Sequence, residues 1–344
     1  MNRTEDARMK MCSRLARESG EDIVGHAFEY DRIIITEMPK PWPRDTDGAR
    51  GHARVLHEFA DRFYDLKMKV YQEHGQETVA ARGLDAVLHH VAPDAEYSPS
   101  GYARVWHLKR PKGPFNAYHK DEYLLPWNDV AGLLEALLFQ KSVSKWERAL
   151  TNDAERVRDL LVCTHGSVDT CCATFGYPTY RKLRSLADRS GGKLRVWQAT
   201  HFQYHRFAPV ILDLPEVRYW GMVGPEHAEA LAWRDIHPKA LRDRYIGWAG
   251  VEREFAQAAE RAAFMREGWK WVSYRKSAQM IRIEETGAQA QVEIDFTSPD
   301  GRFIGRYVAE VTVPGQIPGL IGCLNPGESI DAPQYEVTSI ELVT

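Results

Sequence analysis

The sequence predicts a mixed α/β protein, α+β overall, on three observations. Short apolar runs of strand length alternate with longer segments of helical periodicity through the middle of the chain. From residue 266 onward, apolar and polar residues instead alternate one by one between turn signals, which predicts an antiparallel sheet. The chain has 344 residues, which is long for one hydrophobic core and favours more than one domain.

An N-terminal α+β domain is expected over residues 1–152. The β-branched run 33–35 predicts a buried strand, and the apolar spacing from 52 to 73 predicts an amphipathic helix. His89 and His90 lie beside a turn-rich segment and are expected at the protein surface. The remaining elements are a turn-rich segment, a strand, an extended loop and a helix, over residues 91–101, 102–108, 110–123 and 130–149.

The middle of the chain, residues 153–265, shows the βαβ-ββα order of a thioredoxin-like domain, in which a metal or redox site follows the first strand. Residues 238–265 are expected to add a further helical stretch. The elements in chain order are a strand, a helix, three strands and a helix, over 160–163, 171–188, 193–198, 209–213, 218–223 and 225–234.

A C-terminal antiparallel β segment is expected over residues 266–344. A loop rich in glycine and proline, 313–329, separates its last two strands and carries Cys323, which we expect to be a buried free thiol. The expected strands cover residues 271–283, 291–296, 303–313 and 335–343.

Composition and charge exclude several classes of function. The chain is 44% hydrophobic and 27% charged, with a net charge of -3, which gives no indication of a nucleic-acid or anionic-membrane partner. The N-terminus lacks the apolar core of a secretory signal, and the most apolar segment, 130–139, is too short to span a bilayer. We therefore expect a cytoplasmic protein that binds neither nucleic acid nor membrane, of undetermined oligomeric state. Five cysteines, an odd number, favour reduced thiols over disulfides.

Two cysteines and two histidines form a metal-ligand pattern. Cys163 ends the first strand of the middle domain and Cys172 opens the next helix, where the helix dipole favours the thiolate that metals bind. His201 and His205 follow the second strand at a spacing that can place both imidazoles on one face. Because both pairs follow strands of one βαβ unit, we expect a four-ligand site. Cys171 competes with Cys172 for its place in this set.

Several polar residues beside these ligands are candidates for a supporting role. They can donate hydrogen bonds to the ligands or lie in a solvated loop, and the sequence leaves both interpretations open. They are Cys171, His165, Asp169 and Arg206.

Two sequence strings resemble the sucrase/ferredoxin-like family, whose members are thioredoxin-like 2Fe-2S proteins with two cysteine and two histidine ligands. The strings are VCTHGxxDxCCAxFGxP over 162–178 and HxxxHRFAP over 201–209, and the likeness extends over residues 12–225. Where bacterial members usually have two glycines before the second histidine, this chain has Gln203 and Tyr204.

The resemblance implies that Cys163 and Cys172 hold one iron of a 2Fe-2S cluster, while His201 and His205 hold the other. It favours Cys172 over Cys171 as the second ligand, because the family's second cysteine directly precedes a small residue. Imidazoles make such a cluster less negative than four thiolates do, which raises its reduction potential.

The implied function is electron transfer or redox sensing with an unidentified electron donor or acceptor protein, rather than stand-alone catalysis. Two alternatives stay open. One is a thiol-based redox enzyme of thioredoxin-like fold, although the chain has no Cys-x-x-Cys. The other is a structural zinc-binding protein with the same four ligands. The sequence determines neither the redox partner nor the reduction potential, nor whether the protein is a carrier or a sensor.

Overall fold

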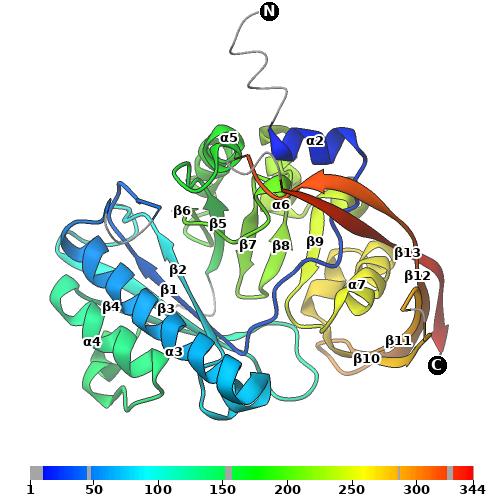
Figure 1. Cartoon of the computed structure of the whole chain (residues 1–344), viewed down its shortest axis with the longest axis horizontal. Coiled ribbons are helices and arrows are strands. Elements are labelled where there is room, and N and C mark those ends of the chain that lie inside the picture. Colours follow the sequence, from blue (N-terminus) through cyan, green and yellow to red (C-terminus); the bar gives the residue numbers. More distant parts are fainter. Residues whose placement is uncertain (1–10, 45–47, 152–156, 286, 324–327, 344) are drawn as a thin grey trace, which may run out of the picture.

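The structure, a computed structural model, describes residues 11–44, 48–151, 157–285, 287–323 and 328–343. Two β-sheets with helices packed on them organise the chain (Figure 1). The predicted α/β class with a C-terminal antiparallel sheet is therefore confirmed. The predicted domain boundary at residue 152 lies outside the described ranges. Among the helices of these ranges, none has both the length and the apolar character needed to cross a bilayer.

The larger sheet is mixed, with nine strands in the order β4-β3-β1-β2-β6-β5-β7-β8-β9. Its strands are β1 (Arg32–Glu37), β2 (Ala86–Val91), β3 (Tyr102–Lys109), β4 (His119–Pro126), β5 (Arg158–Cys163), β6 (Leu194–Ala199), β7 (Ile211–Leu214), β8 (Arg218–Trp220) and β9 (Tyr245–Trp248).

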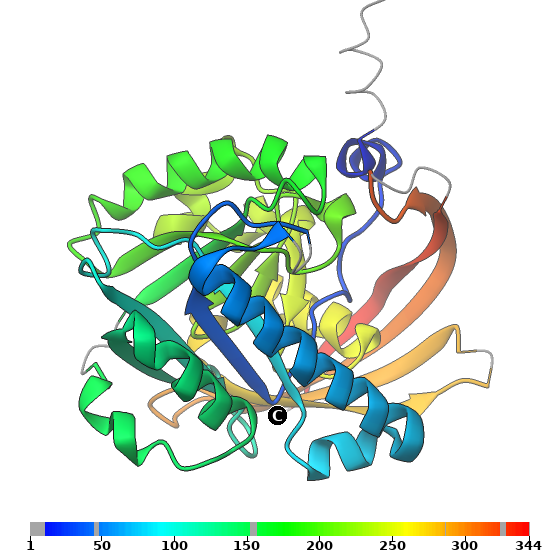
Figure 2. The same ribbon diagram turned by 60° about the vertical axis from the view of Figure 1, so that its left-hand side comes forward.

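The half formed by β1 to β4 carries the helices α3 (Gly51–Ala81) and α4 (Trp127–Leu138) on one face (Figure 2). Their apolar faces share a core with the strands, in which Phe63 and Leu133 are fully buried. The extended loop predicted at 110–123 ends earlier than expected, because its last residues form β4.

Strand β2 was not predicted, and the expectation that His89 and His90 lie at the surface is wrong. Both are less than a tenth exposed, because β2 lies in the interior of the sheet between β1 and β6. Two successive histidines are unusual in a buried strand and led the sequence analysis towards a loop.

The half formed by β5 to β8 has the predicted thioredoxin-like order. Strands β5 and β6 are parallel and joined by the crossover helix α5 (Thr170–Ala187). Strand β7 then pairs antiparallel with β5, β8 pairs antiparallel with β7, and the short helix α6 (Ala228–Trp233) follows. The predicted helical stretch over 238–265 is only partly correct. Four residues that pair with β8 form β9, and α7 (Glu254–Glu267) begins after them.

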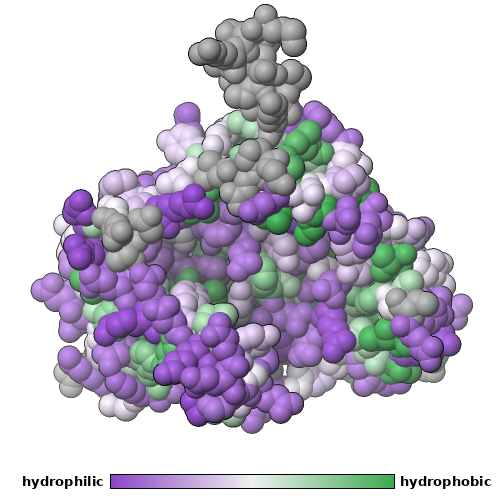
Figure 3. Space-filling view, in the orientation of Figure 1, coloured by the Kyte–Doolittle hydropathy of each residue, from purple (hydrophilic) through white to green (hydrophobic). Residues whose placement is uncertain are grey.

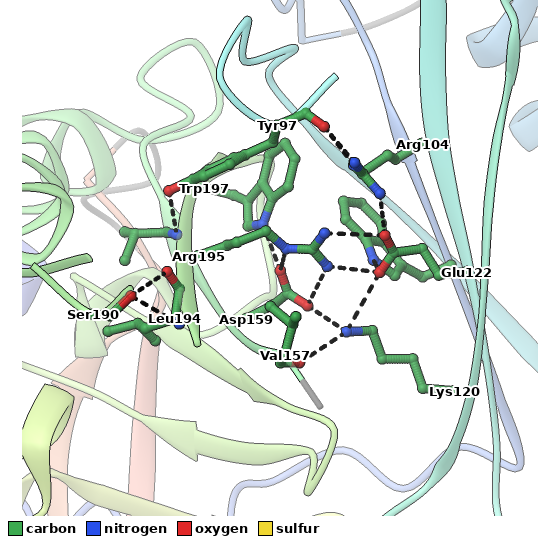
Figure 4. A network of polar contacts seen from close by, with 12 residues as sticks. Tyr97, Arg104, Lys120, Glu122, Val157, Asp159, Ser190, Leu194, Arg195 and Trp197 are labelled. Atoms are coloured by element: carbon green, nitrogen blue, oxygen red, sulfur yellow. Dashed lines mark hydrogen bonds and ion pairs between the residues drawn. The ribbon is translucent and has the colours of Figure 1, made fainter. Parts of the chain in front are cut away.

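The two halves meet at β2 and β6, which pair only at Val91 and Ala199. Buried charges lie between β4 and the β5–β6 pair, where the side chain of Arg195 on β6 contacts Glu122 and Asp159 at 2.6 and 2.7 Å (Figure 4). The Nζ atom of Lys120 lies 2.5 Å from Asp159. The members of this network come from β4 in one half of the sheet and from β5 and β6 in the other. Their side chains therefore connect the two halves at a place where the strands are not paired through their backbones.

The smaller sheet is antiparallel, in the order β10-β11-β12-β13, and α7 packs between it and β9. The glycine- and proline-rich segment predicted as a loop is largely strand. The register between β11 and β12 ends at Thr312, whereas β12 and β13 continue as a two-stranded ribbon that tolerates proline on its unpaired edges. The strands are β10 (Arg275–Ile283), β11 (Gln289–Thr297), β12 (Ile304–Leu320) and β13 (Ser329–Val343).

We call this ribbon, residues 315–320 and 329–334, the hairpin arm. It extends from the small sheet to the N-terminal helix α2 (Cys12–Glu18), which packs against β12 (Figure 1). The arm therefore brings Cys323, just beyond β12, close to the first described helix of the chain.

Candidate metal centre

The four predicted ligands lie at one edge of the large sheet. Cys163 is the last residue of β5, and Cys172 lies in the first turn of α5. His201 follows the end of β6, and His205 begins a short 3-10 helix, His205–Phe207. Because β5 and β6 are parallel, their carboxyl ends meet at this edge, which is where ligands commonly bind in open α/β sheets.

The two cysteine thiols contact each other in the interior. Cys163 and Cys172 are hydrogen-bonded through their side chains and are 1% and 2% exposed. The Cys172 thiol and the backbone N–H groups of His165 and Phe202 donate to the sulfur of Cys163, and together they lower its pKa although burial opposes this. The pKa of Cys172 is correspondingly raised, by its hydrogen bond to Cys163 and by burial. The pair therefore favours a thiolate at Cys163.

The two histidines stack on each other. The ring centroids of His201 and His205 are 4.2 Å apart, and the ring planes differ by 10°. Burial and the neighbouring His205 ring lower the pKa of His201 to about 3, and burial also lowers that of His205. Both imidazoles are therefore neutral at pH 7, the form that binds metals.

Hydrogen bonding identifies the ring nitrogen that carries the lone pair. The backbone N–H of Gln203 donates to Nδ1 of His201 at 3.0 Å, so the ring proton lies on Nε2. Nδ1 of His205 lies 3.8 Å from Sγ of Cys172, which connects the histidine pair to the cysteine pair. The cysteine pair and the histidine pair therefore lie side by side, in contact through Cys172 and His205, as a possible ligand set for a metal centre.

A cavity of about 490 Å³ lies beside the histidines. Its wall includes both rings, the neighbouring His89 and two apolar residues of the hairpin region, Ile321 and Ile330. The cavity gives small solutes and solvent a route to the histidine side of the centre.

The view in Figure 3 shows hydrophobic residues gathered around α2 and over the C-terminal sheet, while the face around α3 and α4 is mainly hydrophilic.

The predicted supporting residues connect the centre to the rest of the chain. Nε2 of His165 lies 3.2 Å from the carbonyl oxygen of Pro43, which joins the loop after β5 to the proline-rich segment that follows β1. Arg206 is buried and forms an ion pair with Glu21 at 2.8 Å. Asp169 caps α5 by accepting a 2.8 Å hydrogen bond from the backbone N–H of Cys171. Each of them fixes a segment that carries a predicted ligand.

Cys171 belongs to a different cluster from Cys172. Its sulfur lies 3.0 Å from that of Cys323 and 3.6 Å from that of Cys12, and the latter two sulfurs are 3.4 Å apart. All five cysteines lie in the described ranges, and each is a free thiol, as predicted for Cys323, although Cys323 is half-buried rather than buried. They divide into a pair, Cys163 with Cys172, and a triplet. The triplet was not predicted from the sequence, where the odd number of cysteines was the available signal.

Fold and site together define a class: an α/β protein whose thioredoxin-like unit carries a candidate metal centre rich in cysteine and histidine. Residues 23–246 match the model of the sucrase/ferredoxin-like family, and the chain belongs to that family. The resemblance inferred from the two motifs is thus confirmed.

Comparison with other known proteins adds little. No curated protein matches the sequence. Among solved structures, the chain is similar to a cysteine-to-serine variant of the thioredoxin-like 2Fe-2S ferredoxin from Aquifex aeolicus. It is 13% identical over 23% of this chain and 85% of that chain, with a TM-score of 0.21. The fold assignment follows from the strand order and the strand registers of this chain.

Proposed function

We propose that this chain is an iron-sulfur protein that transfers electrons or senses redox state through one 2Fe-2S cluster. Its ligands are Cys163, Cys172, His201 and His205. The observation that carries the proposal is the position of the cysteine pair and the histidine pair side by side at the ends of β5 and β6, where Cys172 and His205 are neighbours. Membership of the sucrase/ferredoxin-like family supports it. The orientation of Cys171 towards Cys12 supports Cys172 as the second cysteine ligand.

A cluster with this ligand set supplies one-electron chemistry at a higher potential than an all-cysteine cluster. The residues of this chain prepare the site for it. Backbone N–H groups of His165 and Phe202 stabilise a thiolate at Cys163. Nδ1 of His201 accepts a hydrogen bond from the backbone N–H of Gln203, so iron bound at Nδ1 would replace that hydrogen bond while Nε2 holds a proton. Because both histidines line the cavity, this proton can exchange with solvent and compensate for a change of charge at the site.

The proposal includes a partner protein in the cytoplasm that donates or accepts the electron. The sequence contains neither a GxGxxG nor a GxxxxGK[ST] fingerprint for a dinucleotide or nucleotide, so electrons are expected to come from outside the chain. The histidine side is the expected approach for this partner, since both rings line a cavity there.

The test is spectroscopic and begins with anaerobically purified full-length protein. We expect about two irons and two labile sulfides per chain, and an EPR signal that develops on reduction with dithionite. His201→Cys should retain the cluster and lower its reduction potential, whereas His119→Cys, at an exposed position on β4, should leave it unchanged. Stoichiometric zinc without iron would contradict the proposal, as would a potential that His201→Cys does not change.

A single zinc ion at the same four ligands is the second candidate. Two ligands of one tetrahedral zinc, a thiolate sulfur and an imidazole nitrogen, lie about 3.6 Å apart. The distance of 3.8 Å between Cys172 and His205 is close to this value, although the four ligand atoms do not all lie within 4.8 Å of one another. Metal analysis of the same preparation separates the two candidates. A thiol-based redox enzyme would instead form a disulfide between Cys163 and Cys172, which mass spectrometry detects.

A further inference from the structure

We propose that Cys12, Cys171 and Cys323 form a second metal site, separate from the four-ligand centre, which binds one zinc ion with Asp169 as the fourth ligand. One possible ligand atom from each of these residues lies within 4.8 Å of all the others. Three thiolates and one carboxylate oxygen are ligands that zinc accepts in tetrahedral protein sites.

The distances between the sulfurs fit one ion. They are 3.0, 3.4 and 3.6 Å, and thiolates bound to one tetrahedral zinc lie about 3.8 Å apart. The triangle therefore needs to expand by only a few tenths of an ångström to hold zinc. An iron-sulfur cluster would bind the three thiolates through at least two different irons, which requires a wider separation. The geometry thus favours a mononuclear ion.

Cysteines in a protein interior often pack simply as small hydrophobic residues. Apolar packing does not explain the carboxylate of Asp169, which is 1% exposed. Its oxygens accept hydrogen bonds from the backbone N–H groups of Cys171 and Cys323, at 2.8 and 2.7 Å, and neither amide carries a full charge. A buried carboxylate is costly without a counter-charge, which a zinc ion would supply.

The backbone next to Cys323 also suits a thiolate at that residue. The N–H of Cys12 lies 3.3 Å from Sγ of Cys323. A donor of this kind stabilises negative sulfur. The hydroxyl of Ser13 donates to the carbonyl oxygen of Ala208 at 2.5 Å, which fixes α2 on the segment that follows His205. Zinc would displace the three thiol protons to solvent, without any change of oxidation state.

The site would join three distant parts of the chain. Cys12 begins α2, Cys171 lies in the first turn of α5, and Cys323 follows the hairpin arm. The neighbouring Gly322 lies so close that a Cβ there would be 3.4 Å from Cδ2 of His205. The ion would therefore hold the N-terminal helix and the arm in place beside the four-ligand centre.

Metal analysis of full-length protein tests this site separately from the proposed function. We expect about one zinc per chain, bound with tetrahedral geometry. Cys12→Ala and Cys323→Ala should each lose the zinc and retain iron. Cys163→Ala, the matched control from the other cluster, should lose iron and retain zinc. Circular dichroism confirms that each variant is folded, and Cys323→His, which restores a ligand, should recover zinc if the alanine variant unfolds.

Replacement of zinc by Co²⁺ gives a second measurement that does not depend on iron. The wild-type protein should show sulfur-to-cobalt charge transfer and tetrahedral d–d bands, and Cys323→Ala should lose them. A zinc content unchanged in both Cys12→Ala and Cys323→Ala would overturn the site. So would a disulfide between Cys171 and Cys323 in anaerobically purified protein. If the protein contains no iron, the proposed function fails. The second site would still be supported if Cys12→Ala and Cys323→Ala lose the zinc that the wild-type protein binds.

Discussion

The backbone N–H of Cys323 donates a 2.7 Å hydrogen bond to Oδ2 of Asp169, although the two residues are 154 positions apart. The other carboxylate oxygen of Asp169 caps α5 through Cys171. One buried side chain therefore joins the chain beyond the hairpin arm to the helix that carries Cys172. Removal of this carboxylate is expected to affect the arm and the helix together.

Asp169→Ala should lower the free energy of unfolding of the metal-free protein by roughly 2 kcal/mol, from a lost helix cap and an unpaired buried amide. Hydrogen exchange should also show faster exchange in the hairpin arm. Asp188→Ala removes an exposed carboxylate at the other end of α5, 2.5 Å from Arg184, and should cost less than about 0.5 kcal/mol. Unchanged exchange in the arm of Asp169→Ala would show that the hydrogen bond does not hold it.

Gln203→Gly should stabilise the protein. Gln203 is exposed and has a φ of 65°, in the left-handed region. That conformation costs an L-residue about 1–2 kcal/mol, and glycine relieves this strain. Glycine also loses more conformational entropy on folding, which offsets about 0.5–1 kcal/mol of the relief. A net increase of about 0.5–1 kcal/mol in the free energy of unfolding is expected in urea titrations of the metal-free protein.

Tyr204 provides the contrast, because its φ of 51° is also left-handed but its ring stacks on Phe28 at 5.0 Å. Tyr204→Gly should therefore destabilise the protein by about 2 kcal/mol despite the relief of backbone strain. These are the two positions where bacterial family members usually have glycine. Equal effects of the two substitutions would contradict this account.

Elements with a strong local pattern were predictable from the sequence. The strand, helix and strand from 158 to 199 have apolar runs of the right length, and the C-terminal strands alternate with a period of two. The four residues of the candidate centre were found because they follow those strands in short motifs. The structure brings them together, although the identity of the bound group stays a prediction.

Long-range relationships were not predictable. The single pairing of Val91 with Ala199 joins the two halves of the large sheet, and no local periodicity encodes it. The contact between Cys12 and Cys323 spans 311 positions and depends on how far the hairpin arm extends. The length of the arm was not predicted because its glycines and prolines indicate a loop in most contexts. A two-stranded ribbon tolerates both residues.

The stability of the protein should fall between pH 6.5 and pH 4, with a contribution from His107. Burial, with a smaller effect of Lys109, lowers the pKa of His107 to about 4 in the folded protein, while the unfolded chain titrates near 6.5. In this window the unfolded state binds more protons, so stability is lost as pH falls. His107→Gln should reduce the pH slope by up to about 1.4 kcal/mol per pH unit in denaturation curves. Parallel curves for variant and wild type would contradict the prediction.

Lys120→Met should be among the most destabilising single substitutions. The side chain of Lys120 is fully buried, and its Nζ contacts Asp159 at 2.5 Å and the carbonyl oxygen of Val157 at 3.1 Å (Figure 4). Its removal leaves the buried carboxylate of Asp159 with Arg195 as its remaining ion-pair partner, while Glu122 keeps Arg195 and Arg104, and this loss should cost about 3–5 kcal/mol.

Lys182→Met is the matched control, since Lys182 pairs with Glu229 at 2.8 Å on the surface. An exposed pair of this kind contributes at most about 1 kcal/mol, so the control should unfold close to wild type. Lys120→Met combined with Asp159→Asn should recover part of the loss, because the second substitution removes the buried carboxylate that has lost its lysine partner. If Lys120→Met lies within about 1 kcal/mol of wild type in urea unfolding, water reaches the network and the charges between the two sheet halves are not desolvated.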